Sequence, residues 1–187
     1  SEEEIYLKPE TLQAVGSFKI RGIFYAVASL SEEERRRGLS TVSAGNTAQA
    51  LAWAARHFGV SARSLMPETA PRTKIEAVRS YGATPVLGPV DEVFRYLREH
   101  GWEREPYAYI HPWTNPDVMT GHGSIGLEIV ADLPDVSSVF VPIGGGGLSA
   151  GVGTALKALK PSVRIFGVEP AGCPSLYASF EAGRPAS

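Results

Sequence analysis

The sequence has only one cysteine, Cys173, among its 187 residues. A single thiol excludes a disulfide within the chain and a thiolate metal site built by one chain. An excess of charge of one sign is also missing, because 18 basic and 20 acidic side chains give a formal net charge of −2. This balance excludes a generic polyanion-binding surface, and we predict no nucleic-acid partner.

Long apolar runs are missing as well. None approaches the roughly 20 residues that cross a bilayer, so we predict no membrane span and no membrane partner. The start of the chain, Ser1-Glu2-Glu3-Glu4, is acidic where a secretory signal would be basic. We therefore expect a cytoplasmic protein.

The sequence does contain enough apolar side chains for a core, with 43% hydrophobic residues. Short β-branched segments alternate with longer helical patterns, and glycine, proline or serine separates them. The expected strands are Ile5–Lys8, Ser40–Val42, Ser64–Met66, Thr84–Leu87, Ala108–Ile110, Val139–Pro142 and Arg164–Val168. The expected helices are Ser17–Ser29, Asn46–Phe58, Pro71–Tyr81, Asp91–His100, Gly123–Asp132, Leu148–Leu159 and Ser175–Glu181, and the charged run 32–37 predicts a further solvated helix face.

This alternation predicts an α/β fold with doubly wound parallel sheets. In such a fold the ligand site lies at the carboxyl ends of the strands. Two glycine-containing turns follow expected strands, and each opens a helix. They are Ser43-Ala44-Gly45-Asn46-Thr47 and Gly144-Gly145-Gly146-Gly147.

The four glycines let backbone amides approach a ligand, and the helix from Leu148 adds its positive end, so the turn suits a phosphate. A simple tight turn is the alternative. The pattern Gly145-x-Gly147-x-x-Ala150, with Glu169 22 residues after Gly147, also satisfies a dinucleotide fingerprint, although it lies late in the chain. NAD therefore stays open, whereas a Walker A loop is excluded because no lysine follows the glycines.

Lys19 differs from the other four of the five lysines because apolar side chains flank it at the start of a helix, in Gly16-Ser17-Phe18-Lys19-Ile20-Arg21-Gly22. Desolvation beside the positive helix end lowers the pKa of an amine and suits it to a Schiff base. An ordinary surface lysine is the alternative. We expect the remaining lysines, Lys8, Lys74, Lys157 and Lys160, to be solvated.

The turn from Ser43 to Thr47 offers two hydroxyls, a carboxamide and free helix amides, which suit a carboxylate and a ring oxygen. Simple capping of the helix is the alternative. The four histidines show no metal-ligand spacing, and Gly123-Ser124-Ile125-Gly126 does not match a nucleophile elbow.

Taken together, four ordered motifs resemble the pyridoxal-phosphate enzymes of the tryptophan synthase β type (fold type II), closest to the serine/threonine dehydratases. The motifs are 16–22, 43–50, 144–148 and Gly167-Val168-Glu169-Pro170. Further similarity lies in Met66-Pro67, Tyr81-Gly82-Ala83, 111–117 and 121–128. The resemblance covers nearly the whole chain and favours pyridoxal phosphate over NAD.

The resemblance implies a role for each matching residue. Lys19 would form the Schiff base with pyridoxal 5'-phosphate, Phe18 would flank its ring, and Asn46 would bond its 3-oxygen. The phosphate would be held by Gly144, Gly145, Gly146, Gly147 and Leu148, and the substrate carboxylate by Ser43, Gly45, Asn46 and Thr47. The resemblance also implies a smaller domain over 39–130, with 1–38 and 131–187 as parts of a larger cofactor-binding domain.

The implied activity is that of a lyase that converts L-threonine or L-serine to a 2-oxo acid and ammonia, as a homodimer with an amino-acid substrate. Several positions depart from the family's pattern, and one of them is His122, where many dehydratases have glutamine. Ala44 replaces the second serine of racemases, which disfavours racemisation. Thr47 follows Asn46 where threonine synthases often carry threonine, so a threonine-synthase-like or other β-replacement enzyme is an alternative. Ser175 replaces an acidic cation ligand, so we predict no metal.

The family normally begins before the segment that resembles Ser1 and continues well beyond 175–187. We therefore expect the chain to be an internal fragment, truncated at both ends. A non-catalytic fragment that retains a phosphate-ligand site is the remaining alternative.

Overall fold

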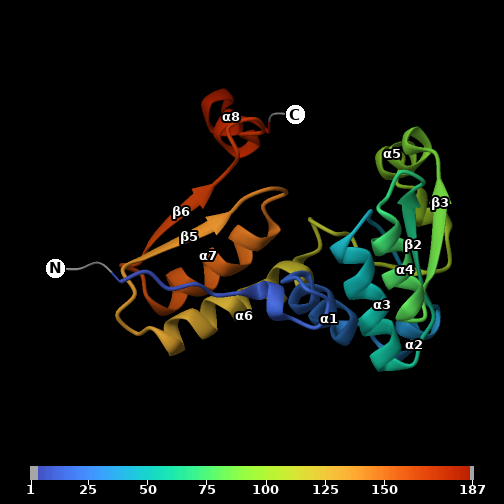
Figure 1. Ribbon diagram of the computed structural model, residues 1–187, viewed down its shortest axis with the longest axis horizontal. Helices are drawn as coiled ribbons and strands as arrows, with labels where there is room; N and C mark the ends of the chain where they lie inside the picture. Colours follow the sequence, from blue (N-terminus) through green and yellow to red (C-terminus); the bar gives the residue numbers. More distant parts are fainter. Residues whose placement is uncertain (1–3, 186–187) are drawn as a thin grey trace. The chain divides into compact units, whose positions relative to one another are not determined.

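The computed structural model describes residues 4–185, and the chain divides into two compact units, Ser1–Val118 and Met119–Ser187 (Figure 1). Residues 1–3 of the acidic start Ser1-Glu2-Glu3-Glu4 lie outside the described residues. The domain boundaries expected near 39 and 130 stay a prediction.

The first unit contains a four-stranded parallel sheet in the order β3-β2-β1-β4. Leu39 pairs with Ala62 on one side and with Ala108 on the other, so β1 is central. Its strands are β1 (Leu39–Val42), β2 (Ala62–Pro67), β3 (Thr84–Gly88) and β4 (Ala108–Tyr109). Parallel neighbours require crossovers, which here contain α3 (Asn46–Phe58), α4 (Arg72–Ser80) and α5 (Val90–Arg98).

The core of this unit forms where α1 (Lys19–Ser29) and α3 pack together beside β1. All four residues of β1 are buried, as expected for a central parallel strand. Five alanines of α3 are buried, and their small side chains allow close approach of the neighbouring elements. Ile23, Leu51 and Met66 fill the space between these elements at no more than 1% exposure.

The second unit pairs β5 (Ser138–Pro142) with β6 (Arg164–Val168) in parallel, and α7 (Gly147–Leu159) connects them. α6 (Pro116–Asp132) lies against α7 through glycines: a Cβ on Gly126 would lie 2.9 Å from Val152 O, and one on Gly123 would lie 3.3 Å from Gly151 O. α8 (Ser175–Ala182) follows β6. The short elements elsewhere are η1 (Glu10–Leu12), α2 (Glu32–Arg36) and η2 (Gly101–Arg104).

The α/β class with parallel sheets is confirmed, and so are six of the seven expected strands. The strand expected over Ile5–Lys8 is wrong, because this segment pairs with no strand; Ile5 and Leu7 are 90% and 87% exposed. The helix expected from Gly123 begins at Pro116, where the Asn115 side chain accepts the amide N–H groups of Asp117 and Val118.

The charged run 32–37 does form a helix. The Ser31 hydroxyl accepts the Glu34 amide N–H, and the Glu34 carboxylate accepts the Ser31 amide N–H, which is a capping box. Within residues 4–185 no helix is both long and apolar enough to cross a membrane.

Candidate active site

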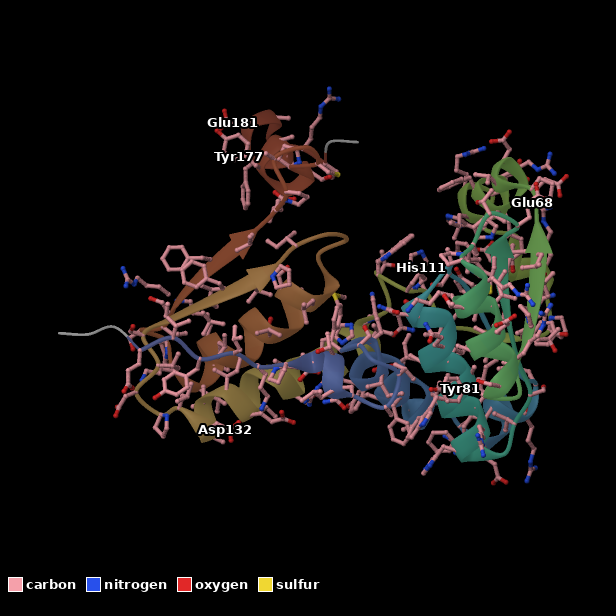
Figure 2. The ribbon with its side chains drawn as sticks, viewed as in Figure 1. Glu68, Tyr81, His111, Asp132, Tyr177 and Glu181 are labelled. Atoms are coloured by element: carbon pink, nitrogen blue, oxygen red, sulfur yellow. The ribbon has the colours of Figure 1, made fainter. Side chains whose placement is uncertain are left out.

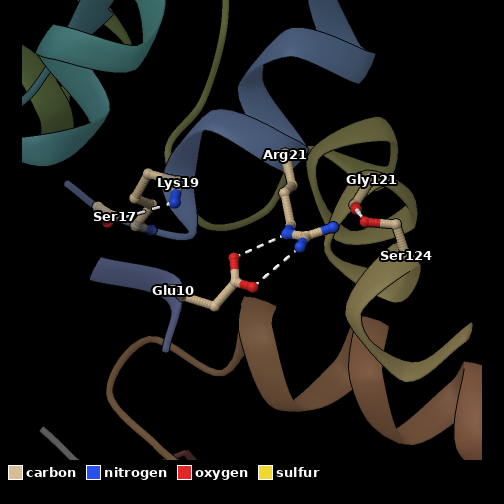
Figure 3. Close-up of polar contacts among 6 residues, drawn as sticks. All are labelled: Glu10, Ser17, Lys19, Arg21, Gly121 and Ser124. Carbon is tan, nitrogen blue, oxygen red and sulfur yellow. Dashed lines mark hydrogen bonds and ion pairs between the residues drawn. The ribbon is translucent and has the colours of Figure 1, made fainter. Parts of the chain in front are cut away.

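Lys19 begins α1, directly after a tight turn in which Gly16 adopts a φ of +66°. The Ser17 hydroxyl accepts the Lys19 amide N–H at 3.3 Å (Figure 3). The Lys19 Nζ donates to the Pro112 carbonyl at 3.4 Å and lies 5.3 Å from the centroid of the Phe18 ring. Burial lowers the pKa of Lys19 from its ordinary value of 10.5, which increases the neutral, nucleophilic fraction of the amine.

The segment before α1 is anchored by a paired contact between Arg21 and Glu10. The Arg21 Nε and Nη2 donate to the two carboxylate oxygens of Glu10 at 2.7 and 2.9 Å (Figure 3). The two side chains are only 13% and 16% exposed, so solvent screens the pair weakly. This contact fixes the first turn of α1, which carries Lys19.

The turn after β1 connects that strand to α3. The Ser43 amide N–H donates to the Leu65 carbonyl at 3.1 Å, and the Ser43 hydroxyl accepts the Gly45 amide N–H at 3.1 Å. Gly45 provides no side-chain cap for α3, so the N-cap residue leaves the first amide N–H groups of this helix for another acceptor. Thr47, in the first turn of α3, is buried. The geometry suits an anionic group held at the helix N-terminus.

Asn46, the first residue of α3, has a partner that the sequence did not predict. Its Oδ1 accepts a hydrogen bond from the Lys74 Nζ at 2.8 Å and a longer one from the Gln49 Nε2 at 3.4 Å. Lys74 was expected to be solvated; its side chain is partly exposed, but its amine bonds to the protein. One signal was available: Lys74 lies in the first turn of α4, where a cation is unfavourable beside the positive helix end.

His111 (Figure 2), which follows β4, is a second residue that the sequence did not single out. Its Nδ1 accepts the amide N–H groups of Trp113 and Thr114 at 3.3 and 3.2 Å, so this atom carries no proton. The rings of Trp102 and Trp113 contact it edge-on. Burial, and secondarily the nearby His100, lowers its pKa from 6.5. His111 thereby fixes the turn that contains Pro112.

The glycine turn of the second unit has an open backbone. Gly146 precedes α7 with a φ of +83°, a conformation that favours glycine, and it provides no side-chain cap. A Cβ built on Gly144 or Gly146 would meet no heavy atom within 4 Å. The first amides of a 13-residue helix are therefore approachable, and the turn fits a phosphate group.

Glu169, considered above as the acidic end of a dinucleotide fingerprint, contacts α8. Its carboxylate oxygens accept the amide N–H groups of Leu176 and Tyr177 at 2.8 and 3.0 Å. The side chain therefore caps a helix within its own unit.

The structure thus brings Phe18, Lys19 and Pro112 together in the first unit and forms the Ser43–Thr47 turn in that same unit. The glycine turn belongs to the second unit. The binding and catalytic roles of these residues stay predictions.

Known proteins similar to this chain are named for threonine chemistry. The L-threonine ammonia-lyase of Thermotoga maritima is 49% identical over 184 residues, which are 97% of this chain and 45% of that protein. The catabolic L-threonine dehydratase TdcB of Escherichia coli K12 is 41% identical over 182 residues, which are 96% of this chain and 55% of that protein. The chain spans about half the length of the curated relatives it matches.

Solved structures agree in fold. Threonine deaminase isoform 2 from Solanum lycopersicum superposes with a TM-score of 0.89 at 42% identity, over 95% of this chain and 49% of that one. Maize serine racemase superposes with a TM-score of 0.91 at 35% identity, over 96% of this chain and 55% of that one. The family described as "Pyridoxal-phosphate dependent enzyme" matches residues 1–187. The chain therefore belongs to the family of pyridoxal-phosphate dependent enzymes.

Proposed function

We propose that the full-length protein containing this chain is a pyridoxal-phosphate dependent dehydratase that converts L-threonine or L-serine to a 2-oxo acid and ammonia. For threonine the product is 2-oxobutanoate. Family membership and the names of relatives at 41% to 49% identity support this proposal. On the same grounds we propose a cytoplasmic homodimer.

The observation that carries the proposal is the environment of Lys19. Its amine is half-buried, its pKa is lowered by that burial, and the Pro112 carbonyl accepts one of its N–H groups. The lowered pKa raises the fraction of neutral amine, whose lone pair can attack an aldehyde and later accept a proton from a substrate carbon. An exposed lysine with an ordinary pKa would be protonated at neutral pH and would do neither well.

Each unit contains residues that fit one part of the cofactor. We assign the phosphate to the amides of Gly144–Leu148. The space beside Gly144 and Gly146 is open, because a Cβ built on either residue would meet no heavy atom within 4 Å. We assign the ring to Phe18 and the ring oxygen to the carboxamide of Asn46. When bound, the cofactor supplies the electron-withdrawing ring that stabilises negative charge on the substrate's α-carbon.

The turn from Ser43 to Thr47 is assigned to the substrate carboxylate. The Ser43 hydroxyl oxygen already accepts the Gly45 N–H, so its proton remains available to donate to a carboxylate. The uncapped amides at the start of α3 add further donors and the positive end of the helix. Ala44 has no proton to transfer, so we propose that the enzyme does not racemise its substrate.

The test is turnover by the full-length protein with pyridoxal phosphate. We expect 2-oxobutanoate and ammonia in equal amounts from L-threonine, and loss of both in Lys19→Ala and Lys19→Arg. Borohydride reduction followed by peptide mapping should label Lys19. Product formed only with an added thiol or a phosphohomoserine substrate would instead favour β-replacement, which Thr47 motivates. Ligand binding without any turnover would favour a non-catalytic protein.

A further inference from the structure

The contact between Lys74 and Asn46 joins the first turns of two helices that are separated in sequence. The Lys74 Nζ lies 2.8 Å from the Asn46 Oδ1. An ammonium group has only donors, so the carboxamide atom that faces it is the oxygen and not the nitrogen. The Gln49 Nε2, at 3.4 Å, donates to the same oxygen. Two donors therefore fix the orientation of the Asn46 carboxamide.

The position of Lys74 is unfavourable for α4 itself. The first turn of α4 contains no acidic residue, and a cation there is repelled by the positive end of the helix. Arg72 lies in the same turn, but its guanidinium bonds to Glu76 at 2.6 Å on the helix surface. Lys74 instead reaches α3. A residue that opposes its own helix and bonds to a site residue indicates a role in the site.

The consequence concerns the other side of the carboxamide. Because the oxygen of Asn46 is turned toward Lys74, its Nδ2 is directed away and presents two N–H donors elsewhere. A rotation of about 180° about the last side-chain bond would present an acceptor in their place. That acceptor would repel a negatively charged ligand oxygen, whereas the N–H groups bond to it.

We propose that Lys74 is a positioning residue that holds the Asn46 carboxamide with its N–H groups toward the ligand's ring oxygen. The inference rests on the proposed function, in which that oxygen belongs to pyridoxal phosphate. Lys74 does not contact the ligand in this proposal. It acts through Asn46, and its removal lets the carboxamide adopt both orientations.

The test uses the full-length protein and two readouts that do not depend on turnover. One is the dissociation constant of pyridoxal phosphate. The other is the ratio of the visible to the near-ultraviolet absorbance of the bound cofactor, which responds to a hydrogen bond at its ring oxygen. Lys74→Met removes the donor, Lys74→Arg retains one, and Lys157→Met is the matched control, because Lys157 donates to the Val163 carbonyl in the second unit.

We expect Lys74→Met to weaken cofactor binding by about tenfold, the scale of one hydrogen bond, and to change the absorbance ratio. Lys74→Arg should retain much of the wild-type affinity and absorbance ratio, and Lys157→Met should change neither the affinity nor the ratio. The double variant Lys74→Met/Asn46→Ala should lose less cofactor affinity than the sum of the losses in the two single variants, because both substitutions remove the same interaction. Circular dichroism identifies a variant that fails to fold, in which case Lys74→Gln replaces it.

The outcomes separate the inference from the proposed function. Wild-type affinity and absorbance ratio in Lys74→Met, or fully additive losses in the double variant, would overturn the inference alone. A wild-type protein that binds no pyridoxal phosphate would overturn both.

Discussion

Replacing Gly151 by alanine tests the close packing of α6 on α7. A Cβ at this position would lie 2.1 Å from the Met119 carbonyl oxygen and 3.0 Å from the Gly123 nitrogen. A carbon normally approaches a carbonyl oxygen no closer than about 3.3 Å, so one helix must shift by about 1 Å. The blocking atoms are backbone and cannot rotate away. Overpacking of this kind costs about 1–3 kcal/mol, which outweighs the gain of up to about 1 kcal/mol from alanine's helix propensity.

Gly153 of the same helix provides the matched control. A Cβ there meets only Ile165 Cδ1 at 3.8 Å, an ordinary contact, so Gly153→Ala should stabilise the protein by about 0.5–1 kcal/mol. Urea titration followed by circular dichroism measures both. We expect a lower midpoint for Gly151→Ala and an unchanged or higher one for Gly153→Ala. Equal midpoints for the two variants would refute the reasoning, because they differ only in what the new methyl group meets.

Three further predictions concern titration and capping. Burial lowers the pKa of Lys19 below 10.5, so between the folded-state and unfolded-state pKa values the unfolded chain binds more protons than the folded chain. The stability of the cofactor-free protein therefore rises with pH in that range. Lys19→Met should remove this rise, which is measured as the urea midpoint at a series of pH values. The pKa of His111 is lowered below 6.5, so stability falls as pH drops from 6.5 toward the folded-state pKa. His111→Asn keeps an acceptor without titrating and should make that fall shallower, whereas His111→Phe should destabilise the protein at every pH; an unchanged slope in the first would contradict the assignment. Glu169→Ala removes the carboxylate that caps α8 and should cost about 1 kcal/mol locally, seen as faster hydrogen exchange at the Leu176 and Tyr177 amides, with unchanged exchange counting against the cap.

The sequence predicted most of the elements because their signals are local. α3 has the predicted bounds, Asn46–Phe58, and both glycine-containing turns follow strands as expected. The predicted start of α6, Gly123, lies after the observed start at Pro116, although Asn115-Pro116 is a helix-start signal; the helix contains Gly121, Gly123 and Gly126. Two of those glycines are needed where α7 approaches closely. Close packing depends on both helices, so the sequence of one segment alone does not predict it.

The candidate site divides in the same way. Lys19 and its apolar flanks could be read from the sequence, because desolvation by adjacent residues is local. Lys74 could not be assigned, since its partner Asn46 lies in another helix and meets it only in the folded chain. The partners of His111 are local amides, but no pattern in the sequence singled out its side chain as their acceptor.

The sequence by itself determined the α/β class, six strands and the two turns that carry glycine, because chain-local periodicity and turn chemistry specify them. Tertiary structure alone decided the strand order β3-β2-β1-β4, the absence of a strand over Ile5–Lys8 and the bond from Lys74 to Asn46. Each of these depends on a partner distant in sequence. A strand needs a neighbour for its backbone hydrogen bonds, and a side chain's role depends on the atom that faces it.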